Sequence, residues 1–201
     1  MKSARKLAYA GICTAISLVS LILGGFVPYV SFMCWVASAI FVAIPMIIFD
    51  KHGALYSVLS ALACSILAFV VTGVGNILYV LPFITFSAPF TLFKVFAETQ
   101  VPLDKTAPIP VFDGVMPVVR TKNRLPKVLM WLVFFFFAEL TIGLEVLIMY
   151  FTVPQTLATL AENKLLYIGI AIVNLIVPIY NVLTTGFLRL AKATAKKVIK
   201  F

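Results

Sequence analysis

The stretch WLVFFFFAELTIGLEVLIMYF, from Trp131 to Phe151, decides how this chain folds. A membrane-spanning helix needs ~20 mostly apolar residues, because each residue advances the helix by ~1.5 Å. The stretch has that length and also carries two carboxylates, Glu139 near its middle and Glu145 nearer its end. A charged group at bilayer depth costs on the order of 3 kcal/mol, so such acids usually face a polar interior. We therefore predict that this helix lines a functional site; the alternative is that each acid only hydrogen-bonds a neighbouring helix.

Composition extends the same conclusion to the whole chain. Its 201 residues are 63% hydrophobic and 11% charged, with a mean hydropathy of +1.12. These values predict an all-α polytopic membrane protein that forms one membrane domain over residues 1–201. The net charge of +9 comes from basic residues that flank apolar spans, which argues against nucleic-acid binding. Cys13, Cys34 and Cys64 lie inside apolar stretches without metal-ligand spacing, so we expect no disulfide, metal site or cofactor.

Six apolar segments predict six transmembrane helices. They cover about residues 7–26, 31–49, 54–71, 77–97, 128–151 and 165–188. Pro82 and Pro89 predict a break in the fourth helix, either to line a cavity with freed carbonyls or only to improve packing. Lys94 and Glu98 predict an i, i+4 pair at the end of that helix, with Lys94 reaching the headgroups.

The connections between these spans differ in kind. Residues 99–127 are rich in proline and basic residues and predict one long cytoplasmic loop, with a short hairpin about Asp113 and Gly114 on the membrane surface. Residues 152–164 are predicted to be a loop. The basic tail that begins at Arg189 can continue the last helix as an amphipathic helix at the headgroups.

Charge predicts the orientation of the six helices. An even number of spans places both termini on one side, and fifteen of the basic residues fall on that side, whereas the opposite loops hold only Lys164. Cytoplasmic loops carry the excess of Lys and Arg, so we expect both termini in the cytoplasm and the chain in a cell membrane. The fifth helix then runs outward. At ~1.5 Å per residue, Glu145 lies ~10 Å below the outer face, Asn174 ~14 Å and Glu139 ~20 Å.

These depths predict a substrate site near the outer face. Glu145 and Asn174 lie at similar depth on helices that a short loop joins, so we expect Glu145 to hold a small water-soluble substrate while Asn174 orients it. The substrate would carry a positive charge or several hydrogen-bond donors. Tyr79 or Tyr167 would supply a stacking or hydroxyl contact, and Glu139 would lie deeper in the same site.

Small residues mark one face of the first helix. Ala4, Ala8, Gly11 and Ala15 recur at i, i+4, i+7 and i+11, which leaves a smooth strip where another helix can approach closely. We call these four residues the small-residue strip. Such a strip serves either packing within the chain or docking of a partner. A similar strip at Ser57, Ala61, Cys64 and Ala68 in the third helix predicts internal packing.

A family resemblance starts from the first helix, RKLAYAGICTAISL. Its AxxxA-type motif at Ala4 to Ala8, with the looser repeat Gly11 to Ala15, and the six-span basic layout resemble the substrate-binding (S) component of energy-coupling factor transporters. The resemblance implies that this face docks on a transmembrane coupling subunit that carries two cytoplasmic ATPases. It also implies that the later helices hold a micronutrient near the outer face. The long loop 99–127 departs from that family's layout.

Two other classes of function compete with transport. An intramembrane enzyme lacks support because the chain has no G-x-S-x-G, no H-E-x-x-H and no paired Asp motif, and its one histidine, His52, lies in a turn. Glu139 and Glu145 stand about 120° apart on a helix, which does not suit two acids that share a proton. We therefore expect a protein that is not an enzyme. A structural or assembly factor, whose polar residues only satisfy each other, stays open as the other alternative.

Overall fold

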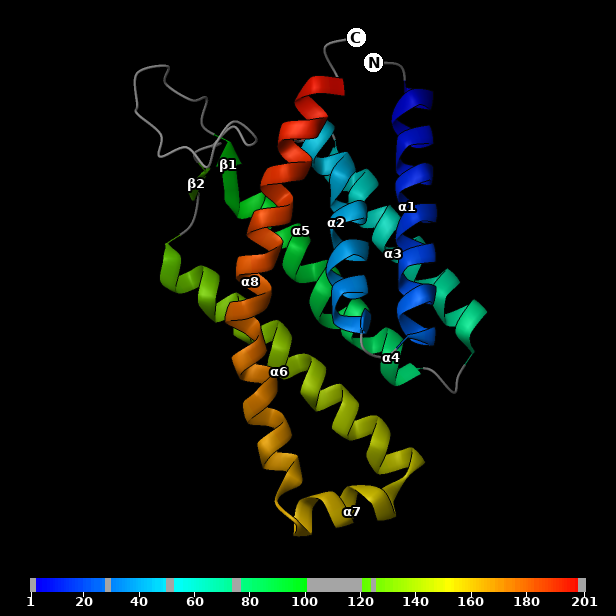
Figure 1. Cartoon of the computed structure of the whole chain (residues 1–201), viewed down its shortest axis with the longest axis vertical. Helices are drawn as coiled ribbons and strands as arrows, with labels where there is room; N and C mark the ends of the chain where they lie inside the picture. The colour runs from blue at the N-terminus through cyan, green and yellow to red at the C-terminus, as the bar shows by residue number, and fades with distance from the viewer. Residues whose placement is uncertain are drawn as a thin grey trace.

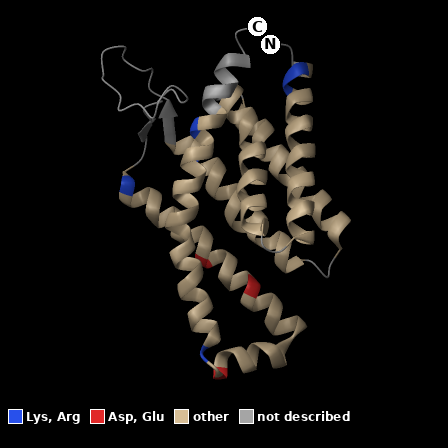
Figure 2. Cartoon of the chain, in the orientation of Figure 1, with Lys and Arg blue, Asp and Glu red and all other residues tan. Residues whose placement is uncertain are grey.

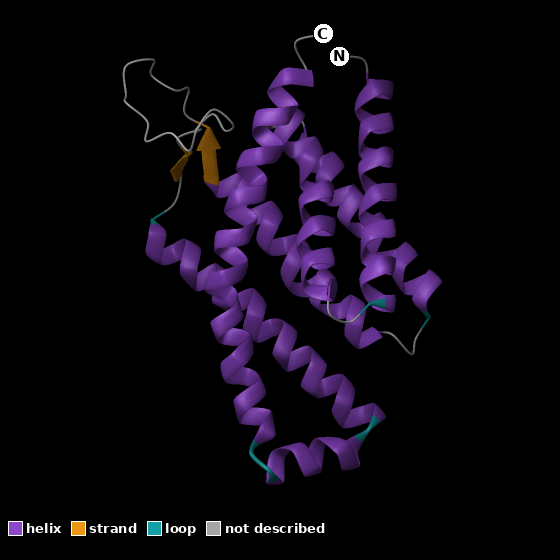
Figure 3. Ribbon diagram, viewed as in Figure 1, coloured by secondary structure: helices purple, strands orange, loops and turns teal. Residues whose placement is uncertain are grey.

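The structure is a computed structural model that describes residues 3–27, 30–49, 53–73, 77–100, 121–123 and 126–198. Six helices in this part of the chain are long and apolar enough to cross a membrane, which confirms the predicted all-α, multi-pass fold. Figure 3 shows that helices form almost all of the part of the chain that the structure describes. The helices are α1 (Ser3–Phe26), α2 (Ser31–Phe49), α3 (Ala54–Thr72), α4 (Ile77–Pro82), η4 (Phe83–Ser87), α5 (Ala88–Ala97), α6 (Lys127–Thr152), α7 (Pro154–Glu162) and α8 (Leu165–Val198).

The two ends of the bundle differ. Helix α1 begins and α8 ends at one end, which we call the terminal end, and α7 lies at the other, which we call the α7 end (Figure 1). Two three-residue strands, β1 (Glu98–Gln100) and β2 (Thr121–Asn123), pair antiparallel where the long connection leaves α5 and returns towards α6. The predicted hairpin about Asp113 and Gly114 lies outside the described residues.

The fourth span leaves the α-helical pattern after Pro82, one of the two prolines at which the sequence predicts an interruption of the helix. Helix α4 ends at Pro82 and the chain continues as the π-helix η4, in which the Ala88 N–H donates to the Phe83 carbonyl. Proline has no N–H to donate to the preceding turn, so the α-helical hydrogen-bond pattern is interrupted there. Single π turns of this kind are frequent at functional sites.

The structure corrects the predicted loop between the last two spans. Residues 154–162, predicted to lie in a loop, form helix α7, which begins with Pro154 at its first position, where the missing N–H costs nothing. Helix α8 continues to Val198, so the predicted extension of the last helix into the basic tail is present. Helices α6 and α8 cross near the middle of the molecule and separate towards α7, which joins them (Figure 1).

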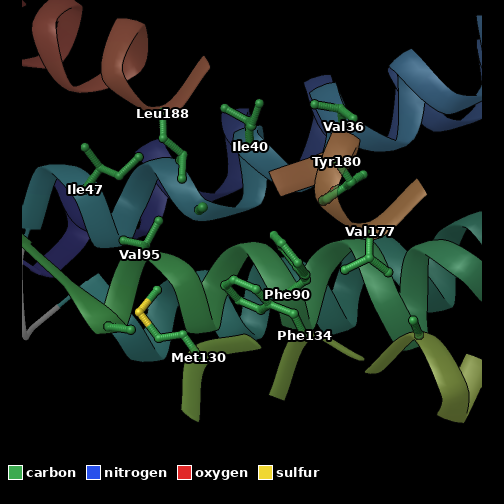
Figure 4. Packing of buried hydrophobic residues seen from close by; sticks show 13 residues of the cluster. Val36, Ile40, Ile47, Phe90, Val95, Met130, Phe134, Val177, Tyr180 and Leu188 are labelled. Atoms are coloured by element: carbon green, nitrogen blue, oxygen red, sulfur yellow. The ribbon is translucent and has the colours of Figure 1, made fainter. Parts of the chain in front are cut away.

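The core sits in the half of the bundle nearer the terminal end. One cluster of buried residues brings α2, α5, α6 and α8 together around Phe90, Phe134 and Tyr180 (Figure 4). The rings of Phe90 and Phe134 stack at 4.0 Å, and Tyr180 meets Phe90 edge-on at 5.0 Å. A second cluster brings α1, α2, α3 and the fourth span together around Leu21 of α1 and Phe83 of η4.

Close helix approach in the core depends on small residues. A Cβ added to Gly53 would lie 2.0 Å from the Pro45 carbonyl oxygen, so only glycine lets α3 begin against α2. In α3, Ser57, Cys64 and Ala68 are buried, which confirms the predicted packing role of that small-residue face.

Candidate functional site

The two acids of α6 face different neighbours, as their spacing predicts. Glu139 is exposed and its Oε1 accepts a hydrogen bond of 2.9 Å from the side-chain amide of Asn174 in α8. Figure 2 shows both acids part-way along α6, on the stretch that leads from the crossing with α8 towards the α7 end. The structure thus pairs Asn174 with Glu139, whereas the sequence pairs it with Glu145.

Glu145 is half-buried. Among the residues that the structure describes, no side chain or backbone group forms a hydrogen bond or ion pair with its carboxyl group. One turn earlier on the same face of α6, the Thr141 hydroxyl lies 2.6 Å from the Thr85 hydroxyl of η4. Residues four apart share a helix face, so Glu145 belongs to the side of α6 that is turned towards the π-helix. An acid at membrane depth without a protein partner is a candidate ligand contact.

The two predicted tyrosines lie in different surroundings. The Tyr79 hydroxyl donates to the Leu21 carbonyl at 2.7 Å and lies against Gly24, and its ring lies against Gly25 and Trp35. Tyr79 therefore fixes α4 to α1. Tyr167 is 67% exposed on the α7 end of α8. The structure brings neither residue into hydrogen-bond contact with Glu145, Glu139 or Asn174.

The small-residue strip of α1 points away from the bundle. Ala4, Ala8, Gly11 and Ala15 are all exposed, and a Cβ added to Gly11 would meet nothing within 4 Å. The buried face of α1 is a different one and consists of Ala10, Cys13, Thr14, Ser17 and Leu21. Internal packing, one of the two roles that the sequence leaves open for the strip, is therefore wrong for the part of the chain described. The strip is free to meet lipid or a partner.

A buried lysine lies near the end of the fourth span. Lys94 is 2% exposed, whereas the sequence predicts that its side chain reaches outward to the headgroups. Its Nζ donates to both the backbone carbonyl and the side-chain oxygen of Asn181, and it lies 5.8 Å from the ring centre of Phe134. The side chain of Glu98, its predicted partner, lies outside the description. Aromatic faces and amide oxygens both stabilise a buried ammonium group.

The sequence held one signal for this contact. Lys94 is the charged residue of the apolar segment 77–97, and Asn181 carries an amide in the terminal-end half of the last span. Polar residues in membrane spans tend to find each other, because lipid offers them no partner. The i, i+4 pair of Lys94 with Glu98 is not tested by this contact and stays a prediction.

Comparisons with known proteins add no relative: no family model matches the chain, and no curated protein or solved structure matches it. Within the described residues, no three His, Cys, Asp or Glu side chains gather in a way that could hold a metal ion. The site therefore rests on its own geometry. It consists of Glu145 on one face of α6 and the Glu139–Asn174 pair on another.

Proposed function

We propose that this multi-pass membrane protein is the substrate-binding component of an energy-coupling factor type importer, and that Glu145 holds its substrate. The observation that carries the proposal is the half-buried Glu145 carboxyl group, which has no hydrogen-bond or ion-pair partner among the described residues. An acid that only held the bundle together would have such a partner, as Glu139 has in Asn174. A cationic or donor-rich small molecule satisfies Glu145 instead.

The exposed strip of α1 supports the docking half of the proposal. A coupling subunit with two cytoplasmic ATPases needs a surface where its helices approach closely, and Ala4, Ala8, Gly11 and Ala15 leave such a surface uncovered. Large side chains cover most of the remaining outward faces of the bundle, which suits contact with lipid tails.

The distribution of charge supports a cytoplasmic terminal end. Arg5 and Lys6 near the start of α1, Lys127 at the start of α6 and Arg189 late in α8 all belong to that end, while Lys164 and Glu162 lie at the α7 end (Figure 2). By the positive-inside rule the α7 end then faces outward, where an importer captures its substrate.

Labelling of single cysteines in intact cells tests this orientation. Thr159→Cys, exposed in α7, should react with a membrane-impermeant maleimide, and Lys127→Cys should react only after the cells are opened. The native Cys13 and Cys64 are buried and Cys34 is half-buried, so they give a low background. The reverse labelling pattern would mean that the α7 end faces the cytoplasm, so that Glu145 does not lie in the outward half.

Co-purification from a bacterial host that encodes the coupling module tests the function itself. The parent protein should bring down the coupling subunit and both ATPases. Ala8→Trp should abolish that recovery while the isolated protein stays folded, because the strip cannot accommodate the added volume against a partner helix. Ile16→Trp adds a similar ring to another exposed face of α1 and should leave recovery unchanged. Equal recovery of the two variants would remove the strip from any docking surface and favour an assembly or structural protein.

A further inference from the structure

The part of the chain that carries Glu145 is attached to the bundle by very little packing. None of residues 143–176, all of which the structure describes, is buried. The last buried residue of α6 is Ile142, α7 has none, and the first buried residue of α8 is Val177. We call residues 143–176 the arm and the rest of the described bundle the body. Few buried contacts mean a low free energy of local displacement.

Both connections between arm and body run through residues that weaken a helix. Gly143 follows Ile142 directly, and glycine in a helix interior costs ~1 kcal/mol relative to alanine. Pro178 follows Val177 in α8 and has no N–H to donate to the Asn174 carbonyl. Sharp bends of long helices occur at such residues. The two helix-weakening positions thus coincide with the two boundaries of the unburied segment.

One polar contact bridges the boundary. Among the described residues, the Asn174 amide and the Glu139 carboxylate form the single side-chain hydrogen bond between the arm and the body, at 2.9 Å. On the body side, by contrast, α8 is held by Tyr180 among three phenylalanine rings and by Asn181 against Lys94. The arm is therefore joined by one exposed contact, while the adjoining part of α8 is anchored in the core.

From these observations we infer that the arm is a hinged lid, which turns about Gly143 and Pro178 and is held in the present position by the Glu139–Asn174 hydrogen bond. Thirteen residues separate Leu165 from Pro178, so the far end of α8 lies ~20 Å from the hinge, and a turn of ~20° moves it by ~7 Å. Glu145 lies two positions beyond Gly143 and moves with the arm, whereas Thr141 and Thr85 stay with the body. Closure would change the distance between the acid and the π-helix. The inference that closure covers a substrate rests on the function proposed above, whereas the inference of a hinge does not.

Electron spin resonance distances in lipid nanodiscs test the hinge without any ligand. One spin-label pair, Phe26→Cys with Tyr167→Cys, joins α1 to the arm, and a control pair, Leu7→Cys with Phe187→Cys, joins the same two helices within the body. All four residues are exposed, and Cys13, Cys34 and Cys64 are replaced by alanine in both samples. The arm pair should give a broad distribution and the body pair a narrow one.

Two sets of variants test the hinge residues and the Glu139–Asn174 hydrogen bond separately. Glu139→Ala removes the hydrogen bond and should broaden the arm distribution or shift it by several Å, towards the ~7 Å that a 20° turn allows. Gly143→Ala with Pro178→Ala strengthens both helices and should narrow it. Ile179→Ala, which shortens an exposed side chain next to the hinge without restoring an N–H, is the matched control. It should leave the distance distribution of the arm pair unchanged. The body pair, narrow throughout, shows that each variant is folded.

An arm distribution as narrow as that of the body pair, and unchanged by Glu139→Ala, would overturn the lid. This result is independent of the substrate. Loss of the hinge would leave Glu145 as a ligand contact, and a substrate that ignores Glu145 would leave the hinge in place.

Discussion

The arm and the body are both built from apolar helices, but the helices of the body are packed against one another and those of the arm are not. The α8 span is more apolar than the span from α4 to α5, yet it is the least buried of the six, and the α4 to α5 span is the least apolar and the most buried. In water this order would be reversed. In a bilayer apolar surface faces lipid at no cost, so burial follows small and polar side chains such as Ser87, Thr91 and Lys94 in the fourth span. Hydropathy therefore locates a helix in this protein but does not tell whether the helix is held by its neighbours.

The largest expected contrast comes from truncating a large apolar side chain on each side of the boundary. Phe134→Ala empties a space between Phe90, Phe93 and Trp131. It should lower the free energy of unfolding by about 3 kcal/mol. This is the low end for such changes in soluble proteins, because in a bilayer the substitution loses packing but no hydrophobic driving force. Leu147→Ala, in the arm and 50% exposed, should change stability by less than about 0.5 kcal/mol. Thermal unfolding in detergent measures both. Equal losses would mean that the arm is packed after all.

Matched glycine substitutions give the next contrast. Gly53→Ala places a methyl group against the Pro45 carbonyl and the Met46 backbone, which cannot move aside, and should cost about 1–3 kcal/mol. Gly169→Ala in the arm meets nothing within 4 Å and should stabilise α8 by up to ~1 kcal/mol. The same unfolding assay applies. A neutral Gly53→Ala would show that α2 and α3 are less closely packed than described.

The buried lysine should show a moderate coupling. In a double-mutant cycle, Lys94→Met and Asn181→Leu should be coupled by about 1.5 kcal/mol, the lower range for a hydrogen bond to a charged group, because Lys94 keeps other contacts. The coupling is read from the stability of the two single variants and the double variant. Additive effects would assign Lys94 to a different partner and leave α8 anchored by core residues such as Tyr180 and Leu188.

The contact between arm and body should show the smallest effect on stability. Glu139 and Asn174 form an exposed pair, so Glu139→Ala and Asn174→Ala should be coupled by less than about 1 kcal/mol in the same kind of cycle. These two substitutions should change the motion of the arm more than the stability of the protein, and the spin-label distances measure that motion. A coupling energy as large as that of Lys94 and Asn181 would mean that the Glu139–Asn174 hydrogen bond fixes the arm firmly to the body and does not open readily.

Much of this fold is present in the sequence, because a bilayer fixes the length and composition of each span. The six helices and the break at Pro82 follow from the apolar segments and the prolines. Helix α7 was missed although Pro154 supplies a start signal, since a short polar helix carries no apolar length. The body–arm division could not be predicted, because burial in a membrane leaves little mark on hydropathy.

The site was predictable only in part. Spacing along α6 placed Glu139 and Glu145 on different faces, and this holds. The pairing of Asn174 with Glu145 assumed that α6 and α8 lie side by side at equal depth. The two helices cross instead (Figure 1), and Asn174 meets Glu139. The exposure of the small-residue strip also required the structure, because the same four residues suit packing and docking equally.

The measurement that tests the account most directly is native mass spectrometry of the protein purified in mild detergent. The parent should carry a small molecule, and Glu145→Gln, which keeps the shape of the side chain but not its charge, should weaken its binding by about ten- to a hundredfold, as the loss of a charged hydrogen bond of roughly 1.5–3 kcal/mol requires. Glu139→Gln, whose pair with Asn174 lies on the other face of α6, should retain the molecule. A parent without bound molecule, or a Glu145→Gln variant that holds it as firmly as the parent does, would contradict the assignment of Glu145 as the substrate contact.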